Sequence, residues 1–82
     1  MNAIEKQVYQ ALMASGWPDS EVKTNESLVD LGLDSLALAL WVSELERQCQ
    51  LRIPFELLSL EQWETIEKAA NLLEPVFKEQ KR

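Results

Sequence analysis

The sequence predicts an all-α fold, in which three main helices and one short helix form a bundle with a long loop between the first and second helices. Three observations support this prediction. Apolar residues recur at helical spacing in three separate segments. Glycine and proline residues stand between these segments, where helices end. The 82 residues suffice for one domain with one modest core, so residues 1–82 are expected to form a single domain.

The first helix is predicted over roughly residues 2–14, and Gly16 and Pro18 follow its end. Its apolar residues at helical spacing are Ile4, Val8, Ala11 and Leu12. A polar, turn-rich loop then covers residues 17–34, and Trp17 is either an anchor of this loop or a surface contact. Four apolar residues should pin the loop to the core: Leu28, Val29, Leu31 and Leu33. Loops longer than about 12–15 residues are often functional.

The second helix is predicted from after Asp34 to about Gln50. One narrow arc of this helix should be buried, and it contains Leu38, Trp41, Val42, Leu45 and Cys49. Leu36 and Leu40 fall on the opposite arc and should face solvent. An exposed apolar pair of this kind indicates a docking surface.

The rest of the chain is predicted to hold a short helix and a last long one. Pro54 breaks the chain and can open a short helix at about residues 55–58. Residues 59–62 fit a capping box for the last helix. The apolar period of that helix is carried by Trp63, Ile66, Ala70, Leu73 and Phe77. Pro75 should bend or end the helix, and the basic tail at about residues 78–82 should fray.

Composition excludes several classes of function. Cys49 is the only cysteine and histidine is absent, so the chain cannot form an internal disulfide, a zinc site or a histidine-based catalytic pair, and we expect no enzyme. The net charge of −6 argues against nucleic acid and favours partners with basic docking faces. No apolar stretch approaches the ~20 residues of a membrane span, and the N-terminus does not resemble a secretory signal. A cytoplasmic monomer without stable membrane insertion is expected.

The most informative stretch runs from Asp30 to Leu36, where the loop ends and Ser35 opens the second helix. A helix N-terminus carries free N–H groups and partial positive charge, which would stabilise a phosphodiester on Ser35. The alternative is that Asp34 and Ser35 only cap the helix. Capping does not explain why Leu36 should be exposed beside the serine. A serine hydrolase is excluded, because residues 32–36 lack the second glycine of a nucleophile elbow and the chain has no histidine.

Residues 31–36, Leu-Gly-Leu-Asp-Ser-Leu, resemble the motif of the acyl, peptidyl and D-alanyl carrier proteins, in which the serine bears phosphopantetheine. The resemblance extends to the Ile53-Pro54 step and to the last helix near residues 65–69. It implies an acyl-carrier-like bundle. The segment at residues 62–65 resembles that of D-alanyl carriers more than that of fatty-acid carriers, which favours an aminoacyl or other specialised cargo.

The resemblance implies that Ser35 accepts phosphopantetheine from coenzyme A and that Asp34 helps a phosphopantetheinyl transferase to hold its magnesium and the serine hydroxyl. Acyl or aminoacyl intermediates would then be held as thioesters for specialised-metabolite, polyketide, nonribosomal-peptide or fatty-acid synthesis. The implied partners are loading and processing enzymes: an adenylating enzyme, an acyltransferase or a ketosynthase. The residues implied in docking are Leu36, Leu40, Glu44, Glu46, Ile53 and Glu56.

One departure from the family pattern concerns charge. The second helix of fatty-acid carriers is acidic, whereas Glu44 and Glu46 are the only carboxylates within this one, so fatty-acid-synthase enzymes are expected to recognise it poorly. Two alternatives remain open. One is an unmodified interaction module with a carrier-like fold, and the other is a helical regulator in which Asp34 and Ser35 are only a cap.

Overall fold

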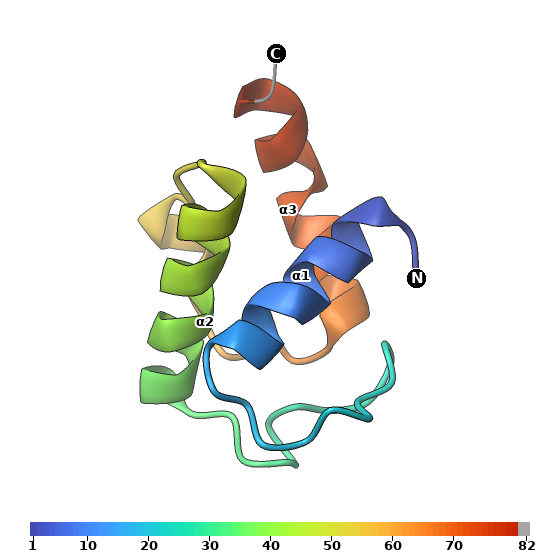
Figure 1. Cartoon of the computed structure of the whole chain (residues 1–82). Coiled ribbons are helices and arrows are strands. Elements are labelled where there is room, and N and C mark those ends of the chain that lie inside the picture. Colours follow the sequence, from blue (N-terminus) through green and yellow to red (C-terminus); the bar gives the residue numbers. More distant parts are fainter. Residues whose placement is uncertain (81–82) are drawn as a thin grey trace.

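The computed structural model describes residues 1–80, which form three α-helices and one short 3-10 helix without any strand. In chain order these are α1 (Ala3–Ala14), α2 (Ser35–Cys49), η1 (Phe55–Leu57) and α3 (Ile66–Gln80). Figure 1 shows α1 between α2 and α3, and α1 packs against both. The predicted all-α fold is confirmed, with the short helix reduced to a single 3-10 turn.

The first helix begins at a capping box that the sequence analysis did not identify. The Asn2 side chain accepts a hydrogen bond from the Glu5 backbone N–H at 2.8 Å, and the Glu5 carboxylate accepts one from the Asn2 backbone N–H at 2.9 Å. Both interactions satisfy donors that a helix end leaves unpaired. After Ala14 the chain turns at Gly16, whose φ of +102° favours glycine.

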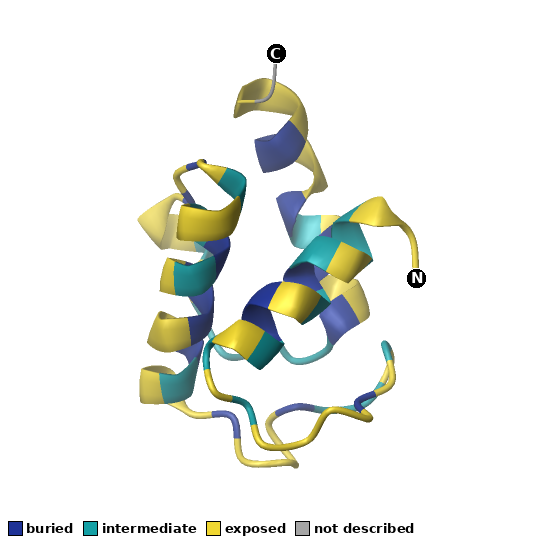
Figure 2. Cartoon of the chain, in the orientation of Figure 1, coloured by how far each residue is buried: buried dark blue, intermediate teal, exposed yellow. Residues whose placement is uncertain are grey.

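Buried residues line the inward faces of the helices, as Figure 2 shows. Two completely buried tryptophans, Trp41 and Trp63, lie at the centre of this core. The rings of Trp41 and Trp63 meet edge to face, with centroids 5.0 Å apart and planes inclined by 77°. The indole N–H groups of these two tryptophans both have hydrogen-bond partners. Trp41 donates to the Val8 carbonyl at 3.0 Å, which ties α2 to α1, and Trp63 donates to the Leu57 carbonyl at 2.8 Å. Cys49, expected on the buried arc, is only half-buried, and its thiol lies 2.7 Å from the Gln7 side-chain oxygen.

The long loop before α2 is anchored, as predicted, but not by all of the expected residues. Leu28 and Leu33 are buried, whereas Val29 and Leu31 are each 41% exposed. The reason is local geometry. The backbone N–H groups of Leu31 and Leu33 both donate to the Leu28 carbonyl, so the chain turns tightly and its intervening side chains point outward. Val22, which the sequence analysis did not select, is buried instead.

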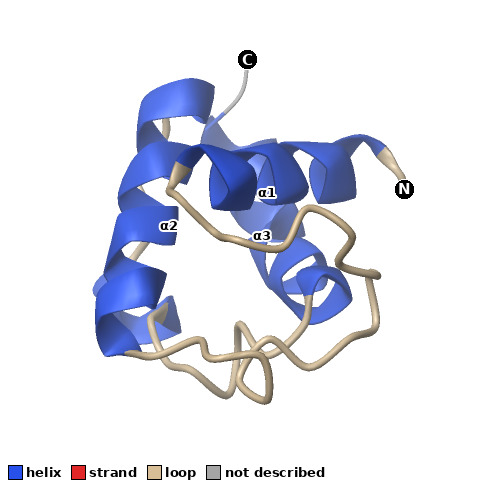
Figure 3. Ribbon diagram, turned by 60° about the horizontal axis from the view of Figure 1, so that its bottom comes forward, coloured by secondary structure: helices blue, strands red, loops and turns tan. Residues whose placement is uncertain are grey.

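Backbone hydrogen bonds fasten this loop to the start of α3. The Leu28 N–H donates to the Glu64 carbonyl at 2.7 Å, and the Glu67 N–H donates to the Thr24 carbonyl at 2.9 Å. Trp17 also packs against the core, as a loop anchor, and its indole nitrogen is buried without a hydrogen-bond partner among the described residues. Figure 3 shows the long loop running from the end of α1 past α3 to the lower end of α2. The loop therefore holds the start of α2 in a defined position.

The last helix begins later than the predicted capping box at Ser59. Ser59 caps only an isolated turn, in which its hydroxyl accepts from the Gln62 N–H at 3.3 Å. The chain then bends, because the Glu64 carbonyl is taken by the loop instead of a helical N–H. Thr65 provides the actual cap, and its hydroxyl accepts from the Lys68 N–H at 2.9 Å.

The last helix does not end at Pro75 but continues to Gln80. A proline within a helix removes one hydrogen bond, and here packing compensates for it, because Val76 and Phe77 are buried. The Gln80 side chain donates to the Arg52 carbonyl at 2.7 Å and accepts from the Arg52 N–H at 2.8 Å. Residues 78–80, expected in a frayed tail, are thus helical, and residues 81–82 lie outside the described part of the chain.

Candidate functional site

The site begins where the loop becomes α2. Asp34 is in the extended conformation, and its carboxylate accepts a hydrogen bond from the Ala37 N–H at 2.9 Å. Its carbonyl accepts from the Leu38 N–H at the same distance. Asp34 is therefore the N-cap, and Ser35 is the first helical residue rather than part of the cap. Capping of α2 therefore depends on Asp34 and does not require the Ser35 hydroxyl.

The residues just before the cap fix its position. Gly32 has a φ of +112°, which explains why the sharp turn before α2 carries a glycine. Leu33 follows it into the core and holds the chain there, and its N–H donates to the Leu28 carbonyl at 2.8 Å. Ser35 is consequently presented by a turn anchored on one side and a helix on the other.

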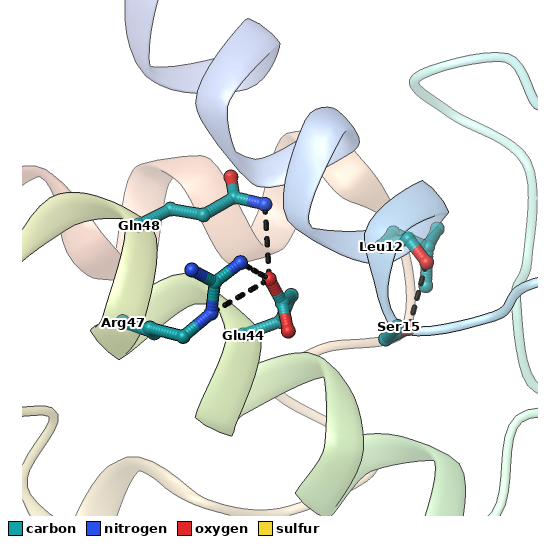
Figure 4. Close-up of polar contacts among 5 residues, drawn as sticks. All are labelled: Leu12, Ser15, Glu44, Arg47 and Gln48. Carbon is teal, nitrogen blue, oxygen red and sulfur yellow. Dashed lines mark hydrogen bonds and ion pairs between the residues drawn. The ribbon is translucent and has the colours of Figure 1, made fainter.

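Among the serines, Ser35 is placed differently from those in turns. Ser15 donates to the Leu12 carbonyl at 2.7 Å, as Figure 4 shows, and Ser59 donates to the Gln62 side chain at 2.9 Å. Ser35 is exposed, and its hydroxyl makes no hydrogen bond within residues 1–80. The N–H groups of Ser35 and Leu36 also lack partners there. The partial positive charge of these N–H groups complements the negative charge of a phosphodiester, so the site fits phosphopantetheine.

The predicted exposure of two leucines on α2 is confirmed. Leu36 is 70% exposed and Leu40 is 50% exposed, on the side of the helix away from the core. They lie one and five residues after Ser35, so an apolar strip follows the serine along the helix. Such a strip beside an exposed hydroxyl suits contact with an apolar surface of another protein.

The two carboxylates of α2 have different surroundings. Glu44 accepts hydrogen bonds from Arg47 and from Gln48, both of which reach back toward it in Figure 4. The hydrogen bond from Arg47 lowers the pKa of Glu44 below its ordinary value, and the same bond raises the pKa of Arg47. Glu46 instead accepts from the Ile53 N–H at 2.8 Å. Glu44 is thus paired with a cation, whereas Glu46 is not.

The remaining expected docking residues differ in accessibility. Ile53 is a buried core residue, so its side chain is not part of the surface. Glu56 is exposed on η1. Its neighbour Phe55, which the sequence analysis did not select, is 85% exposed. The sequence feature that could have indicated this exposure is the position of Phe55 directly after Pro54, at the start of a short helix.

A groove of about 560 Å³ begins at Ser35 and runs along α2. Its opposite wall is the segment of residues 58–60 that follows η1. The residues of α2 that line it form one stripe at helical spacing: Ser35, Leu38, Ala39, Val42, Ser43 and Glu46. Sequence periodicity alone could not identify this groove, because its second wall is irregular backbone.

No group of three or more Cys, Asp or Glu side chains in residues 1–80 is placed to hold a metal ion. No helix within those residues has the length and apolar character needed to cross a membrane.

The family model described as the phosphopantetheine attachment site matches residues 12–73, which include the long loop, α2 and about the first half of α3. No curated protein and no solved structure matches. The domain of this family carries phosphopantetheine covalently on a serine. Because the match covers most of the chain, the protein belongs to the phosphopantetheine-attachment family, the superfamily of acyl and peptidyl carrier proteins.

Proposed function

We propose that Ser35 is the serine that carries phosphopantetheine and that the chain delivers acyl or aminoacyl intermediates between enzymes of a biosynthetic pathway. One observation supports this proposal above all. Ser35 is exposed, with an unbonded hydroxyl, at the first position of a helix that another residue caps. When bound, phosphopantetheine supplies a thiol that holds such intermediates as thioesters.

Attachment requires a phosphopantetheinyl transferase and coenzyme A. The Ser35 oxygen attacks the phosphorus that bears the pantetheine, a new O–P bond forms, and the bond to the departing adenosine bisphosphate breaks. The hydroxyl proton passes to a base on the transferase. Asp34 lies next to Ser35 with one carboxylate oxygen engaged in the cap, so the other oxygen is available to a magnesium ion held by the transferase.

The chain itself acts as a carrier in this proposal, without catalysis of its own. Its partners are the transferase, a loading enzyme such as an adenylating enzyme or an acyltransferase, and processing enzymes such as a ketosynthase. Each partner meets the exposed strip of Leu36 and Leu40 beside the serine. A monomer in the cytoplasm fits this role.

Intact mass spectrometry tests the proposal. The purified chain is incubated with coenzyme A and a transferase of broad specificity, and the mass should rise by one phosphopantetheine. An unchanged mass with transferases of several classes would instead favour the unmodified interaction module.

Substitutions at Asp34 should separate the capping role from the role in attachment. Asp34→Asn keeps a side-chain oxygen for the cap, so the free energy of unfolding should change little, whereas Asp34→Ala should lose about 1 kcal/mol. Both variants remove the carboxylate and should slow attachment by at least tenfold. Denaturant unfolding and the rate of mass increase are the two measurements. Wild-type attachment by Asp34→Asn would show that the carboxylate acts only as a cap.

Partner recognition should depend more on apolar contact than on charge along α2. Leu40→Ala removes half-exposed apolar surface, whereas Glu44→Gln changes a carboxylate already neutralised by Arg47. Leu40→Ala should therefore slow loading by the natural partner several-fold more than Glu44→Gln does. The comparison is made by loading kinetics at physiological salt, where surface charge is largely screened. The reverse order would contradict this prediction.

A further inference from the structure

The groove that begins at Ser35 ends at a carboxylate. Ser35 and Glu46 are both on its α2 wall, eleven residues apart in one continuous helix. At a rise of 1.5 Å per residue, this separation is about 16 Å along the helix axis. The distance matters because whatever is attached to Ser35 and lies in the groove has a defined reach.

The length of the arm agrees with the length of the groove. From phosphorus to sulfur, phosphopantetheine has a main chain of about fourteen atoms joined by about thirteen bonds, equivalent to just over four extended residues, or about 15 Å. An arm extended along the groove from Ser35 would bring its sulfur level with Glu46. The group attached to that sulfur would then contact the Glu46 end of the groove.

Glu46 is held in place and keeps an unpaired charge. One carboxylate oxygen accepts the Ile53 N–H at 2.8 Å, which fixes the side chain between α2 and the chain before η1. The other oxygen has no partner within residues 1–80. The ion pairs within residues 1–80 involve other carboxylates, those of Glu44, Glu64 and Glu74. Glu46 is half-buried, so a cation beside it is less screened than at an open surface.

The chemistry of the walls changes along the groove. Near its middle, Ala39 and Val42 of α2 offer small apolar surface. The opposite wall is formed by Leu58, Ser59 and Leu60. Toward Glu46 the wall gains the Ser43 hydroxyl. An alkyl chain extending beyond the sulfur would displace water from a carboxylate and a hydroxyl without replacing their hydrogen bonds, which is unfavourable. A short cargo with a positive charge would satisfy both groups.

We propose that the Glu46 end of this groove binds the ammonium group of an aminoacyl cargo carried on Ser35. The inference rests on the proposed function, because it requires the arm on Ser35. It assigns Glu46 to cargo recognition, in place of the docking role that the family resemblance implies.

The test compares two cargoes of the same shape. Alanyl and isobutyryl groups differ in that an ammonium replaces a methyl group. Each is linked to the arm through an amide in place of the thioester, for stability, and is transferred to the full chain from the corresponding coenzyme A analogue. Backbone amide signals are recorded by ¹H–¹⁵N NMR at about pH 6.5, where an α-amino group of pKa about 8 is protonated. The chain variants are Glu46→Gln and, as a matched control, Glu44→Gln.

The alanyl form should shift the signals of Ser43, Glu46 and Ile53 relative to the isobutyryl form. Glu46→Gln, whose amide oxygen can still accept from Ile53, should remove that difference, and Glu44→Gln should retain it. Equal shifts for the two cargoes, or a difference that survives in Glu46→Gln, would overturn the inference. A chain that never gains the arm would refute the proposed function instead, and intact mass distinguishes the two failures before any spectrum is recorded.

Discussion

Replacing Ser35 with alanine is expected to abolish phosphopantetheine attachment completely while leaving the fold intact. The hydroxyl oxygen is the atom that forms the new bond, and alanine offers no substitute. The free energy of unfolding should change by no more than about 0.5 kcal/mol, because Asp34 caps α2 and the Ser35 hydroxyl makes no hydrogen bond in the described chain. Were Ser35 itself the cap, the loss would be about 1 kcal/mol.

Intact mass and circular dichroism provide the two measurements for Ser35→Ala. Ser43→Ala is the matched control, because Ser43 is also an exposed serine on α2 and also lines the groove. The control should gain one phosphopantetheine at the wild-type rate. If Ser35→Ala gained it as well, another serine would be the attachment site and the central proposal would be wrong.

Regular elements of this fold could be predicted from the sequence, because helical periodicity determines which side chains face inward. On α2 the predicted buried arc and the predicted exposure of Leu36 and Leu40 are both confirmed, apart from the half-buried Cys49. The position of Ser35 at the start of that helix was predictable for the same reason, since Asp34 is a strong cap and the apolar period begins directly after it.

Irregular segments could not be predicted in the same way. The exposure of Val29 and Leu31 depends on tight turns around the Leu28 carbonyl, and no periodic pattern encodes them. The late start of α3 depends on a hydrogen bond between Leu28 and Glu64, which are distant in sequence. A capping rule that considers only the residues next to Ser59 cannot predict a contact of this kind.

In the candidate site, too, local motifs can be predicted from the sequence, whereas contacts made by tertiary structure cannot. Ser35 and Asp34 are adjacent residues in a local motif, so the sequence alone is enough to propose both. The role proposed for Glu46 depends on Ile53, which the turn after α2 brings back beside the helix. The exposure of Phe55 depends on η1 being only three residues long. Both are consequences of tertiary structure.

The largest effect on stability is expected for Trp41→Ala. Trp41 is completely buried, contacts Trp63 edge to face, and donates its indole N–H to the Val8 carbonyl. Removing the ring leaves a cavity between α2 and the rest of the core, and substitutions of this kind cost about 3–5 kcal/mol. Small domains have a total stability of about 5–15 kcal/mol, so the variant should lose a large share of its stability and come close to unfolding even without denaturant.

Denaturant unfolding measures this loss, with Leu40→Ala as the control on the same helix. Leu40 is one residue before Trp41 but half-exposed, so its replacement should cost no more than about 0.5 kcal/mol. Phosphopantetheine attachment adds a second measurement. If the transferase requires the folded start of α2, attachment to Trp41→Ala should fall with the folded fraction as denaturant is added, while Ser35 itself is unchanged. An unfolding free energy within about 1 kcal/mol of wild type would show that Trp41 does not hold α2 to the core as its contacts indicate.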